Sequence, residues 1–353
     1  MTETGVKMDN LSNIPRVERR AIRIESDKPV RFETSQPGSR TLPLIIHSPT
    51  TGLHLHSWMT ANRAVFERAL LEHGGILFRG FQVGGIDGFR NVVSATGAEL
   101  EQYTYRSTPR TELGGGVYTS TEYPADKSIP LHNENSYSDA WPRRVFFYCE
   151  LPAQQGGETP IADSYRVFDR IPSDIREKFI ARKVMYVRNY GWGVDLPWQE
   201  VFQTSDRDKV ELFCGEHGVQ VEWLDGERLR TRQVCQAVAG HPDTGKMAWF
   251  NQAHLFHISS LEPAVHDALL EAFSEDELPR NACYGDGSRI ADDELNAVRE
   301  AYAQEEVCTP WQPEDVLLVD NMAVAHGRKP FKGDRKIRVA MTHPMNSIQY
   351  REQ

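Results

Sequence analysis

Apolar residues recur along the chain in two patterns, one typical of helices and the other typical of strands. Apolar side chains at helical spacing predict helices over residues 60–73, 86–96, 165–170, 173–181, 263–273 and 292–303. Short apolar runs that end at turn residues predict strands over residues 75–81, 129–134, 145–148, 246–250, 316–319 and 337–341. Many short strands around a few helices favour a mainly β fold with helical decoration, of the α+β class, and a jelly-roll core is its natural architecture.

The first part of the chain differs in character from the rest. Residues 1–40 are polar and mixed in charge, with Pro15, Pro29 and Pro37 spread through them. We expect these residues to form an extended N-terminal lead-in rather than a domain. The chain of 353 residues is long enough to bury a substantial core, and no internal repeat or change in composition divides it. We therefore expect residues 41–353 to form a single domain.

Charge and composition exclude several classes of protein. The net charge of −10 argues against a nucleic acid or an anionic membrane as the main partner. No apolar run reaches the roughly 18 residues that span a bilayer, and the start of the chain lacks the apolar core of a signal peptide, so a cytoplasmic protein is expected. The five cysteines form no CxxC pair, which indicates neither a disulfide framework nor a zinc–thiolate site.

The most informative motif is the segment IPLHNE at 129–134, in which apolar residues precede His132 and Glu134. In a strand, residues i and i+2 leave the same face, so this imidazole and this carboxylate would point together. Taken alone the spacing is common, and a packed or surface pair is its ordinary explanation. His326, which follows an apolar strand far downstream, can complete a facial triad of two histidines and one carboxylate. That donor set suits non-haem Fe(II) and leaves coordination positions open for O2 and a co-substrate.

An arginine further along the chain can hold the carboxylate of such a co-substrate. Arg335 begins the last predicted strand, in which Arg335, Ile337 and Val339 share one face. A planar guanidinium binds carboxylates through two parallel hydrogen bonds, so Arg335 is the expected anchor. Arg338 lies on the other face and is expected to meet solvent or an acidic partner. Thr159, in a Gly-Gly-Glu-Thr-Pro turn, can donate its hydroxyl to the same carboxylate, although such a threonine is more often an ordinary turn residue.

Taken in order, these motifs resemble the taurine dioxygenase-like family of Fe(II)/2-oxoglutarate oxygenases. The resemblance covers roughly residues 70–341 and rests on GILFRGF at 75–81, HNE at 132–134, GGET at 156–159, His326 and Arg335. It implies a double-stranded β-helix core, that is, a jelly roll. It also implies that Fe(II) binds His132, Glu134 and His326. The co-substrate 2-oxoglutarate would chelate the iron, with its distal carboxylate held by Arg335 and Thr159.

Three further runs resemble one branch of this family, that of the syringomycin-pathway aspartate hydroxylase, which is related more loosely to clavaminate synthase. These runs are LHNENSY at 131–137, WFNQ at 249–252 and HGRKPF at 326–331. Two departures from the taurine enzyme matter. The acidic ligand of that enzyme is aspartate, whereas this chain has Glu134, and the position of its sulfonate-binding arginine is Val339 here. A sulfonate substrate is therefore not expected. Glu134 also argues against halogenation, because halogenases on this scaffold lack the carboxylate ligand.

Several polar residues near these motifs are candidates for binding the substrate. They are Tyr118, Glu122, Ser128, Asn251 and Gln252. His254 and His257 follow soon after, but the site already has two better-placed imidazoles, so a structural role is expected for both. Trp249, Phe250 and Phe256 are expected in the core rather than as a platform for the substrate.

The resemblance implies an oxygenase that consumes 2-oxoglutarate and O2 and releases succinate and CO2. We expect hydroxylation of an unactivated C–H bond in an amino acid or amino-acid-derived substrate, free or tethered to a carrier protein, in specialised metabolism. Two alternatives use the same cofactors, namely desaturation or cyclisation, and catabolic oxygenation of a small organic acid. A metal-binding barrel module without enzymatic activity is a further alternative, and the complete ligand set argues against it.

Overall fold

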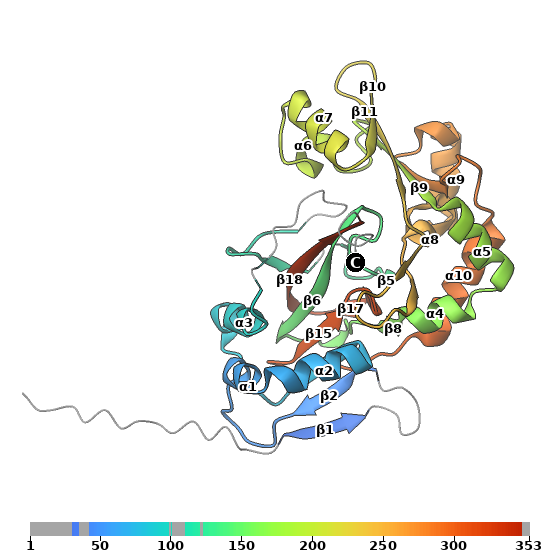
Figure 1. The fold of residues 1–353 in the computed structure, drawn as a ribbon. Coiled ribbons are helices and arrows are strands. Elements are labelled where there is room, and N and C mark those ends of the chain that lie inside the picture. Colours follow the sequence, from blue (N-terminus) through green and yellow to red (C-terminus); the bar gives the residue numbers. More distant parts are fainter. Residues whose placement is uncertain (1–29, 35–41, 99, 101–109, 121–122, 348–353) are drawn as a thin grey trace, which may run out of the picture.

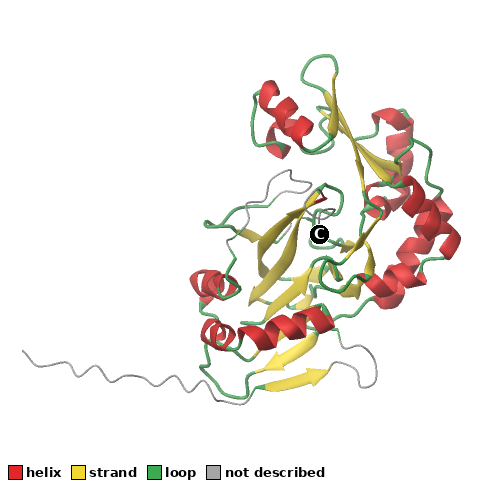
Figure 2. Ribbon diagram, in the orientation of Figure 1, coloured by secondary structure: helices red, strands yellow, loops and turns green. Residues whose placement is uncertain are grey.

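The computed structural model describes residues 30–34, 42–98, 100, 110–120 and 123–347. In the view of Figures 1 and 2, β6, β15 and β18 lie in the middle of the molecule, and helices α4, α5, α9 and α10 lie along its right-hand side. The predicted mixture of α and β structure is confirmed. In the part of the chain that the structure describes, no helix combines the length and the apolar character needed to cross a bilayer.

A large sheet of seven strands forms the centre of the fold. All of its neighbouring strands are antiparallel except β2 and β3, which are parallel. In spatial order the strands are β1 (Arg31–Thr34), β2 (Leu44–His47), β3 (Gly75–Arg79), β15 (Val316–Asp320), β6 (Ala140–Leu151), β18 (Lys336–Asn346) and β4 (Val117–Thr119). The first strand belongs to the predicted lead-in, so part of that segment joins the sheet.

Both faces of the middle strands of this sheet are buried, and alternate side chains along each strand pack on opposite faces. On one face, Ile76 and Phe78 of β3 pack in a cluster with three helices, which are α1 (Leu55–Ala61), α2 (Arg63–His73) and α3 (Gly85–Ser94). On the other face, Leu77 joins Phe147 and Val339 in a second cluster. Burial on both sides explains why β3 and β15 are continuous apolar runs in the sequence.

A second sheet packs against that other face. It consists of β5 (Ile129–His132), β16 (Val324–Arg328) and β8 (Ile161–Asp163), in the order β5-β16-β8. Ile161 and Val324 from this sheet belong to the same cluster as Phe147 of the large sheet. The two sheets therefore enclose one shared layer of side chains, and the candidate site lies at the edge of this layer. Two short strands, β7 (Gln155–Gly156) and β17 (Phe331–Lys332), pair beside it.

The remaining elements form an outer layer around a four-stranded sheet with the order β10-β11-β9-β14. Its strands are β9 (Val184–Tyr190), β10 (Val219–Trp223), β11 (Leu229–Cys235) and β14 (Arg280–Tyr284), and a separate hairpin pairs β12 (Val238–Gly240) with β13 (Met247–Trp249). The helices are α4 (Ser164–Arg170), α5 (Ser173–Arg182), α6 (Trp198–Val201), α7 (Arg207–Glu216), α8 (Ala253–Phe256), α9 (Pro263–Ala272) and α10 (Asp292–Glu305). Two 3-10 turns are η1 (Ile258–Ser260) and η2 (Glu275–Glu277).

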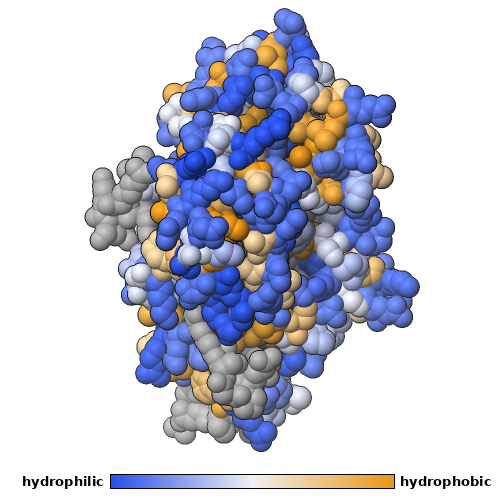
Figure 3. Space-filling view, turned by 90° about the vertical axis from the view of Figure 1, so that its right-hand side faces the viewer, coloured by the Kyte–Doolittle hydropathy of each residue, from blue (hydrophilic) through white to orange (hydrophobic). Residues whose placement is uncertain are grey.

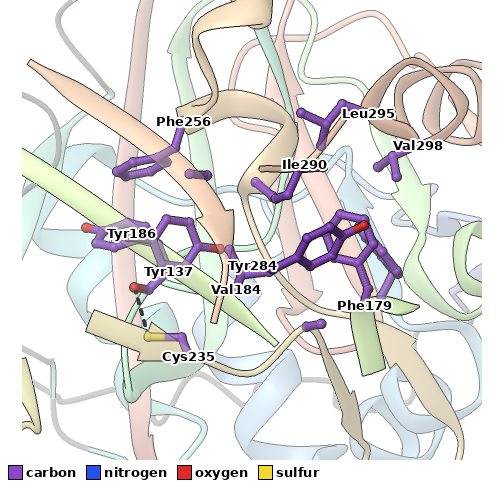
Figure 4. Packing of buried hydrophobic residues seen from close by; sticks show 14 of the residues in the cluster. Tyr137, Phe179, Val184, Tyr186, Cys235, Phe256, Tyr284, Ile290, Leu295 and Val298 are labelled. Atoms are coloured by element: carbon purple, nitrogen blue, oxygen red, sulfur yellow. Dashed lines mark hydrogen bonds between the residues drawn. The ribbon is translucent and has the colours of Figure 1, made fainter. Parts of the chain in front are cut away.

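An aromatic cluster joins this outer layer to the site. The rings of Tyr137, Tyr186 and Phe256 contact one another, with centroid distances of 6.3, 5.2 and 5.0 Å (Figure 4). The thiol of Cys235 donates to the Tyr137 carbonyl at 3.3 Å. Tyr137 and Phe256 also line the cavity described below, so the cluster connects the outer layer to the cavity wall.

Helix α9 is exceptional among the described helices of its length because none of its residues is buried. Leu261, Val265 and Leu270 are exposed on it or next to it. Hydrophobic side chains gather in the upper part of the face on which this helix lies (Figure 3).

The six predicted helices are all present, with shifted ends. The helix predicted over residues 60–73 is interrupted at Asn62, where α1 ends and α2 begins. The strand predicted over residues 145–148 is the middle of the 12-residue strand β6. The strand predicted over residues 129–134 ends earlier, at His132, so the prediction that Glu134 continues it is wrong.

Candidate metal centre

Three potential metal ligands converge where the second sheet meets the large sheet. One ligand atom from each of His132, Glu134 and His326 lies within 4.8 Å of the other two. His132 ends β5 and is in register with His326 of the neighbouring strand β16. The centroids of the two imidazole rings are 4.7 Å apart. The structure thus brings together the three side chains that the sequence singled out.

Glu134 reaches this position from a turn. Residues 134–137 form the turn that follows β5, and Asn135 adopts a positive φ of 54°. The backbone of Glu134 is held by the side chain of Asn321, which accepts from the Glu134 N–H at 2.7 Å and donates to the Glu134 carbonyl at 2.9 Å. The convergence of His132 and Glu134 therefore comes from a side-chain network, because the strand that was expected to align them has already ended.

Asn133, between the two candidate ligands, fixes the same turn from its other side. Its amide donates to the Ser164 hydroxyl at 2.9 Å and to the Asn321 carbonyl at 2.6 Å. Its own carbonyl accepts from the Gln252 amide at 2.8 Å and from the Ser136 hydroxyl at 2.9 Å. Since Asn133 is fully buried, each of these hydrogen bonds also avoids the cost of an unpaired polar group.

The hydrogen bonding of His132 leaves one ring nitrogen directed to the site. Its Nδ1 lies 2.8 Å from the Pro130 carbonyl, which can only accept, so Nδ1 carries the proton. The lone pair is then on Nε2, the nitrogen available to a metal. Burial, reinforced by the neighbouring His326, lowers the pKa of His132 to about 4. The imidazole is therefore neutral at physiological pH, which is the form that binds metals.

Glu134 is a buried carboxylate that stays ionised. Burial alone would raise its pKa, but the guanidinium of Arg110, with Nη2 2.9 Å from Oε2, and the ring of His326 together hold the pKa of Glu134 well below its usual range. The same oxygen is 3.5 Å from Nε2 of His326. Arg110 was not identified from the sequence, because it stands in a polar stretch without any motif.

His326 is positioned by packing against the large sheet. Its side chain is 5% exposed, and its ring meets the ring of Phe147 edge to face at a centroid distance of 4.9 Å. Phe147 belongs to β6, so this contact fixes the imidazole relative to the central sheet. Two imidazoles and one carboxylate held in this way form a donor set that suits non-haem Fe(II).

A cavity of about 160 Å³ opens beside His132 and Glu134, and His326 is not among the residues that line it. It is lined by Arg110, Tyr123, Ser128, Ile129, Pro130, His132, Glu134, Tyr137, Gln252, Leu255, Phe256 and Arg280. Two of the predicted substrate-binding residues, Ser128 and Gln252, are therefore in its wall. Phe256 belongs to the buried core, as expected, and it also lines the cavity. Trp249 and Phe250 are fully buried, as expected.

The other predicted substrate-binding residues are placed differently. Tyr118 is buried in the cluster between the two sheets. Asn251 is fully buried, and its amide donates to the Ala237 carbonyl and accepts from the Ala253 N–H. Glu122 lies outside the residues that the structure describes. A substrate role for any of these residues stays a prediction.

Arg335 and Thr159 flank the turn between β7 and β8. The Arg335 Nε donates to the Gly157 carbonyl at 2.8 Å, and Nη1 donates to the Ser120 hydroxyl at 3.3 Å. Within the described ranges no carboxylate lies at ion-pair distance from Arg335, and burial lowers its pKa to about 10. Thr159 is buried two residues after Gly157. Gly156 makes the turn possible, since a Cβ there would lie 2.2 Å from the Pro330 carbonyl oxygen.

The two neighbouring histidines have structural partners. Nε2 of His254 donates to the Leu131 carbonyl at 2.9 Å, directly behind the strand that carries His132. His257 accepts from the Ser259 N–H and begins η1. Neither belongs to the group of converging potential ligands. Arg338 is paired with Glu150, with Nε 2.6 Å from the carboxylate, as expected for the opposite face of the strand.

Comparison with known proteins adds independent information. Residues 39–341 match the model of the family described as taurine catabolism dioxygenase TauD, TfdA family. The dapdiamide synthesis protein DdaC of Enterobacter agglomerans is 42% identical over 309 residues, which cover 86% of this chain and 94% of that protein. A clavaminate synthase-like protein of Arabidopsis thaliana is 32% identical over 314 residues, which cover 85% of this chain and 90% of that protein.

Among solved structures, the fold is similar to that of the PvcB protein from Pseudomonas aeruginosa. The TM-score is 0.55 at 16% sequence identity, and the match covers 91% of this chain and 95% of that chain. Because the family model spans most of the chain and the two relatives match over nearly their whole length, the protein belongs to the TauD, TfdA family of dioxygenases.

Proposed function

We propose that the protein is an Fe(II)- and 2-oxoglutarate-dependent hydroxylase acting on an amino acid or an amino-acid-derived substrate, free or tethered to a carrier protein. The observation that carries this proposal is the convergence of His132, Glu134 and His326 within 4.8 Å beside a cavity. We assign the iron to these three side chains. We also assign the core to the double-stranded β-helix type, in one domain over residues 41–353, and the fold similarity to PvcB supports this.

The three residues fit Fe(II) by their chemistry. His132, which is half-buried, offers a neutral Nε2, and the buried Glu134 offers an ionised carboxylate. Two imidazoles and one carboxylate occupy one face of the ion and leave the other positions open. When bound, Fe(II) together with 2-oxoglutarate and O2 supplies the oxidant for an unactivated C–H bond, and succinate and CO2 are released.

Arg335 fits the distal carboxylate of 2-oxoglutarate. It is a half-buried cation that bonds one carbonyl and one hydroxyl in the described structure, and burying a charge without a counter-ion is costly. A dicarboxylate would supply the missing negative charge through a bidentate contact. Thr159, on the neighbouring turn, is our candidate for a second contact to the same carboxylate.

The cavity wall supports a small, partly polar substrate. Tyr137, Leu255 and Phe256 provide apolar contacts, and Ser128 and Gln252 provide polar ones. A biosynthetic role in specialised metabolism is supported by the relation to a dapdiamide synthesis protein. Desaturation or cyclisation would require the same site, and so would catabolic oxygenation of a small organic acid. The family membership argues against a metal-binding module without activity.

The test is anaerobic addition of Fe(II) and 2-oxoglutarate, followed by a search for the visible charge-transfer band of the chelated co-substrate. We expect the band in the wild type and in a His266→Ala control on α9, and its loss in His326→Ala and Glu134→Ala. Absence of the band from the wild type would falsify the proposal. Perturbation of the band by free amino acids, carrier-bound amino acids or simple carboxylates would then separate the substrate classes.

A further inference from the structure

The segment 123–128 forms part of the wall of the cavity without being a helix or a strand. Tyr123 and Ser128, at its two ends, line the cavity together with His132 and Glu134. Its only described internal backbone hydrogen bond runs from the Lys127 N–H to the Pro124 carbonyl at 3.2 Å. A segment with so few contacts of its own needs an external anchor to keep a fixed position.

Arg328 provides that anchor through three hydrogen bonds to the segment. Its Nη1 donates to the Tyr123 carbonyl at 2.9 Å. Its Nη2 donates to the Pro124 carbonyl at 2.5 Å and to the Lys127 carbonyl at 2.8 Å. A fourth bond comes from the adjoining strand β17, where the Phe331 N–H donates to the Ala125 carbonyl at 2.8 Å. Four of the six carbonyls of the segment thus accept hydrogen bonds from β16 and β17.

The anchor and a candidate metal ligand share one strand. Arg328 follows His326 by two residues in β16, which pairs with β5 immediately after the segment. Gly327 between them allows the close crossing, because a Cβ there would lie 2.6 Å from the Ile129 carbonyl oxygen. Arg328 therefore links the segment directly to the strand that carries His326.

The charge of Arg328 is balanced in an unusual way. The side chain is buried, and among the described residues no carboxylate lies within ion-pair distance of it. Instead its guanidinium faces the three carbonyls and lies over the rings of Tyr123 and Phe331, at 5.8 and 5.2 Å from their centroids. Carbonyl dipoles and aromatic faces both stabilise a cation. Loss of the guanidinium would leave the carbonyls of the segment without donors.

We propose that Arg328 is a positioning residue, which holds segment 123–128 over the cavity and so limits the access of water to the metal. This inference rests on the proposed function, because it assigns the metal to the adjacent triad. The hydrogen bonds of Arg328 in the described structure go to the segment, and after burial its charge is the next cause of the lowered pKa of Arg335. A lysine cannot reproduce the arrangement, since one ammonium cannot reach the three carbonyls with the geometry of a planar fork.

Limited trypsin digestion of the metal-free protein tests the mechanical part of the inference. The Lys127–Ser128 bond lies within the segment, and its cleavage is followed by mass spectrometry. We expect slow cleavage in the wild type, an increase of roughly tenfold or more in Arg328→Gln, and an intermediate increase in Arg328→Lys. Arg176→Gln is the matched control, because Arg176 also donates to a backbone carbonyl, that of Phe168, and lies over an aromatic ring, but it does not line the cavity. If Arg328→Gln does not fold, Arg328→Lys carries the test.

Water access is measured separately, by the longitudinal relaxation of water protons in the presence of Mn(II) and 2-oxoglutarate. We expect faster relaxation in both Arg328 variants than in the wild type and in Arg176→Gln, with the affinity for Mn(II) changed less than about threefold. Rapid cleavage of the wild type at Lys127, or equal cleavage and relaxation in all variants, would overturn the inference. Failure of the wild type to bind the metal would instead overturn the proposed function, while the digestion result would still stand.

Discussion

The side chain of Asn321 pairs with the backbone of Glu134 as a neighbouring strand would. It accepts from the Glu134 N–H at 2.7 Å and donates to the Glu134 carbonyl at 2.9 Å, and it also donates to the Pro142 carbonyl at 2.8 Å. Asn321 is fully buried. The backbone that carries a candidate metal ligand is therefore fixed by one amide from a distant part of the chain.

We predict that Asn321→Asp weakens metal binding by roughly 10- to 100-fold, as is typical when a residue that orients a ligand is changed. A carboxylate can still accept from the Glu134 N–H, but it cannot donate to the two carbonyls, and it adds a buried charge. Mn(II) titration followed by its electron paramagnetic resonance signal measures the affinity. A lower stability is also expected, by about 1–3 kcal/mol for the unsatisfied carbonyls.

The control for this prediction is Asn189→Asp. Asn189 is equally buried and donates to two carbonyls, those of Asp276 and Leu278, but it lies on β9 outside the site. We expect this variant to lose stability without losing metal affinity. Equal metal affinity in both variants would show that Asn321 matters only for stability.

Two arginines near the start of β18 give a second prediction. Arg335 lies directly before this strand, which begins one residue later than predicted, and Arg338 lies within it. We expect Arg335→Lys to raise the KM for 2-oxoglutarate by roughly 10- to 100-fold, because an ammonium cannot form the bidentate contact of a guanidinium. Arg338→Lys is the matched control, because Arg338 is paired with Glu150. We expect this variant to change the KM by less than about twofold. Succinate formation at varied 2-oxoglutarate concentration measures both. A similar rise in both variants would remove Arg335 from its assigned role.

How much of the fold the sequence could predict depended on how completely each element is buried. Strand β15 is buried along its whole length and stands out as a continuous apolar run, and helix α10 has the helical spacing that its packing requires. Strand β4 has only three residues and β7 only two, which is too short to show a pattern. Such strands are defined by their partners, and those partners are far away in the sequence.

The candidate site shows the same limit at the level of single side chains. His132, Glu134 and His326 could be grouped from their residue types and order, but the reason for their convergence was misjudged. Residue alternation applies only while a strand continues, and β5 ends at His132. What aligns Glu134 is a network around Asn321, and what balances its charge is Arg110. Neither residue stands in a motif that could have identified it.

A pH-dependent contribution to stability is expected from His217. Its Nδ1 lies 2.9 Å from the carboxylate of Asp139, and this hydrogen bond raises the pKa of His217 above its ordinary value of 6.5. A raised pKa in the folded state means that the stabilisation is fully present below pH 6.5. It is lost as the pH rises through the folded-state pKa, because the imidazole then becomes neutral in both states.

We therefore predict that His217→Gln destabilises the protein more at pH 6 than at pH 9, as measured by urea unfolding at several pH values. Asp139→Asn should remove the same pH-dependent part, and the double variant should show no further pH-dependent loss. A destabilisation that is constant across this range would mean that His217 contributes through packing on Phe213, which lies 4.3 Å away by ring centroid.

The ion pair between Arg110 and Glu134 leads to a prediction about metal removal. Both side chains are about 5% exposed or less, so the two buried charges stabilise each other while no metal is bound. Removing one partner of a buried pair typically costs about 3–5 kcal/mol. A divalent cation on Glu134 would supply the lost positive charge. We therefore expect Arg110→Gln to destabilise the metal-free protein strongly and the Mn(II)-loaded protein much less.

The measurement is the difference in Tm with and without Mn(II), compared between the wild type and Arg110→Gln. A ligand that binds the folded state more tightly produces a larger rise in Tm. A larger rise with Mn(II) in Arg110→Gln than in the wild type would therefore mean that Arg110 and the metal compete for the Glu134 carboxylate. Arg79→Gln is the control, because Arg79 forms a comparable pair with the buried Asp315 through Nη2 at 2.6 Å. It should lower the Tm of both forms equally. An equal rise with Mn(II) in all three proteins would mean that the Arg110 pair is independent of metal binding, and Glu134 would then lose its place among the proposed ligands.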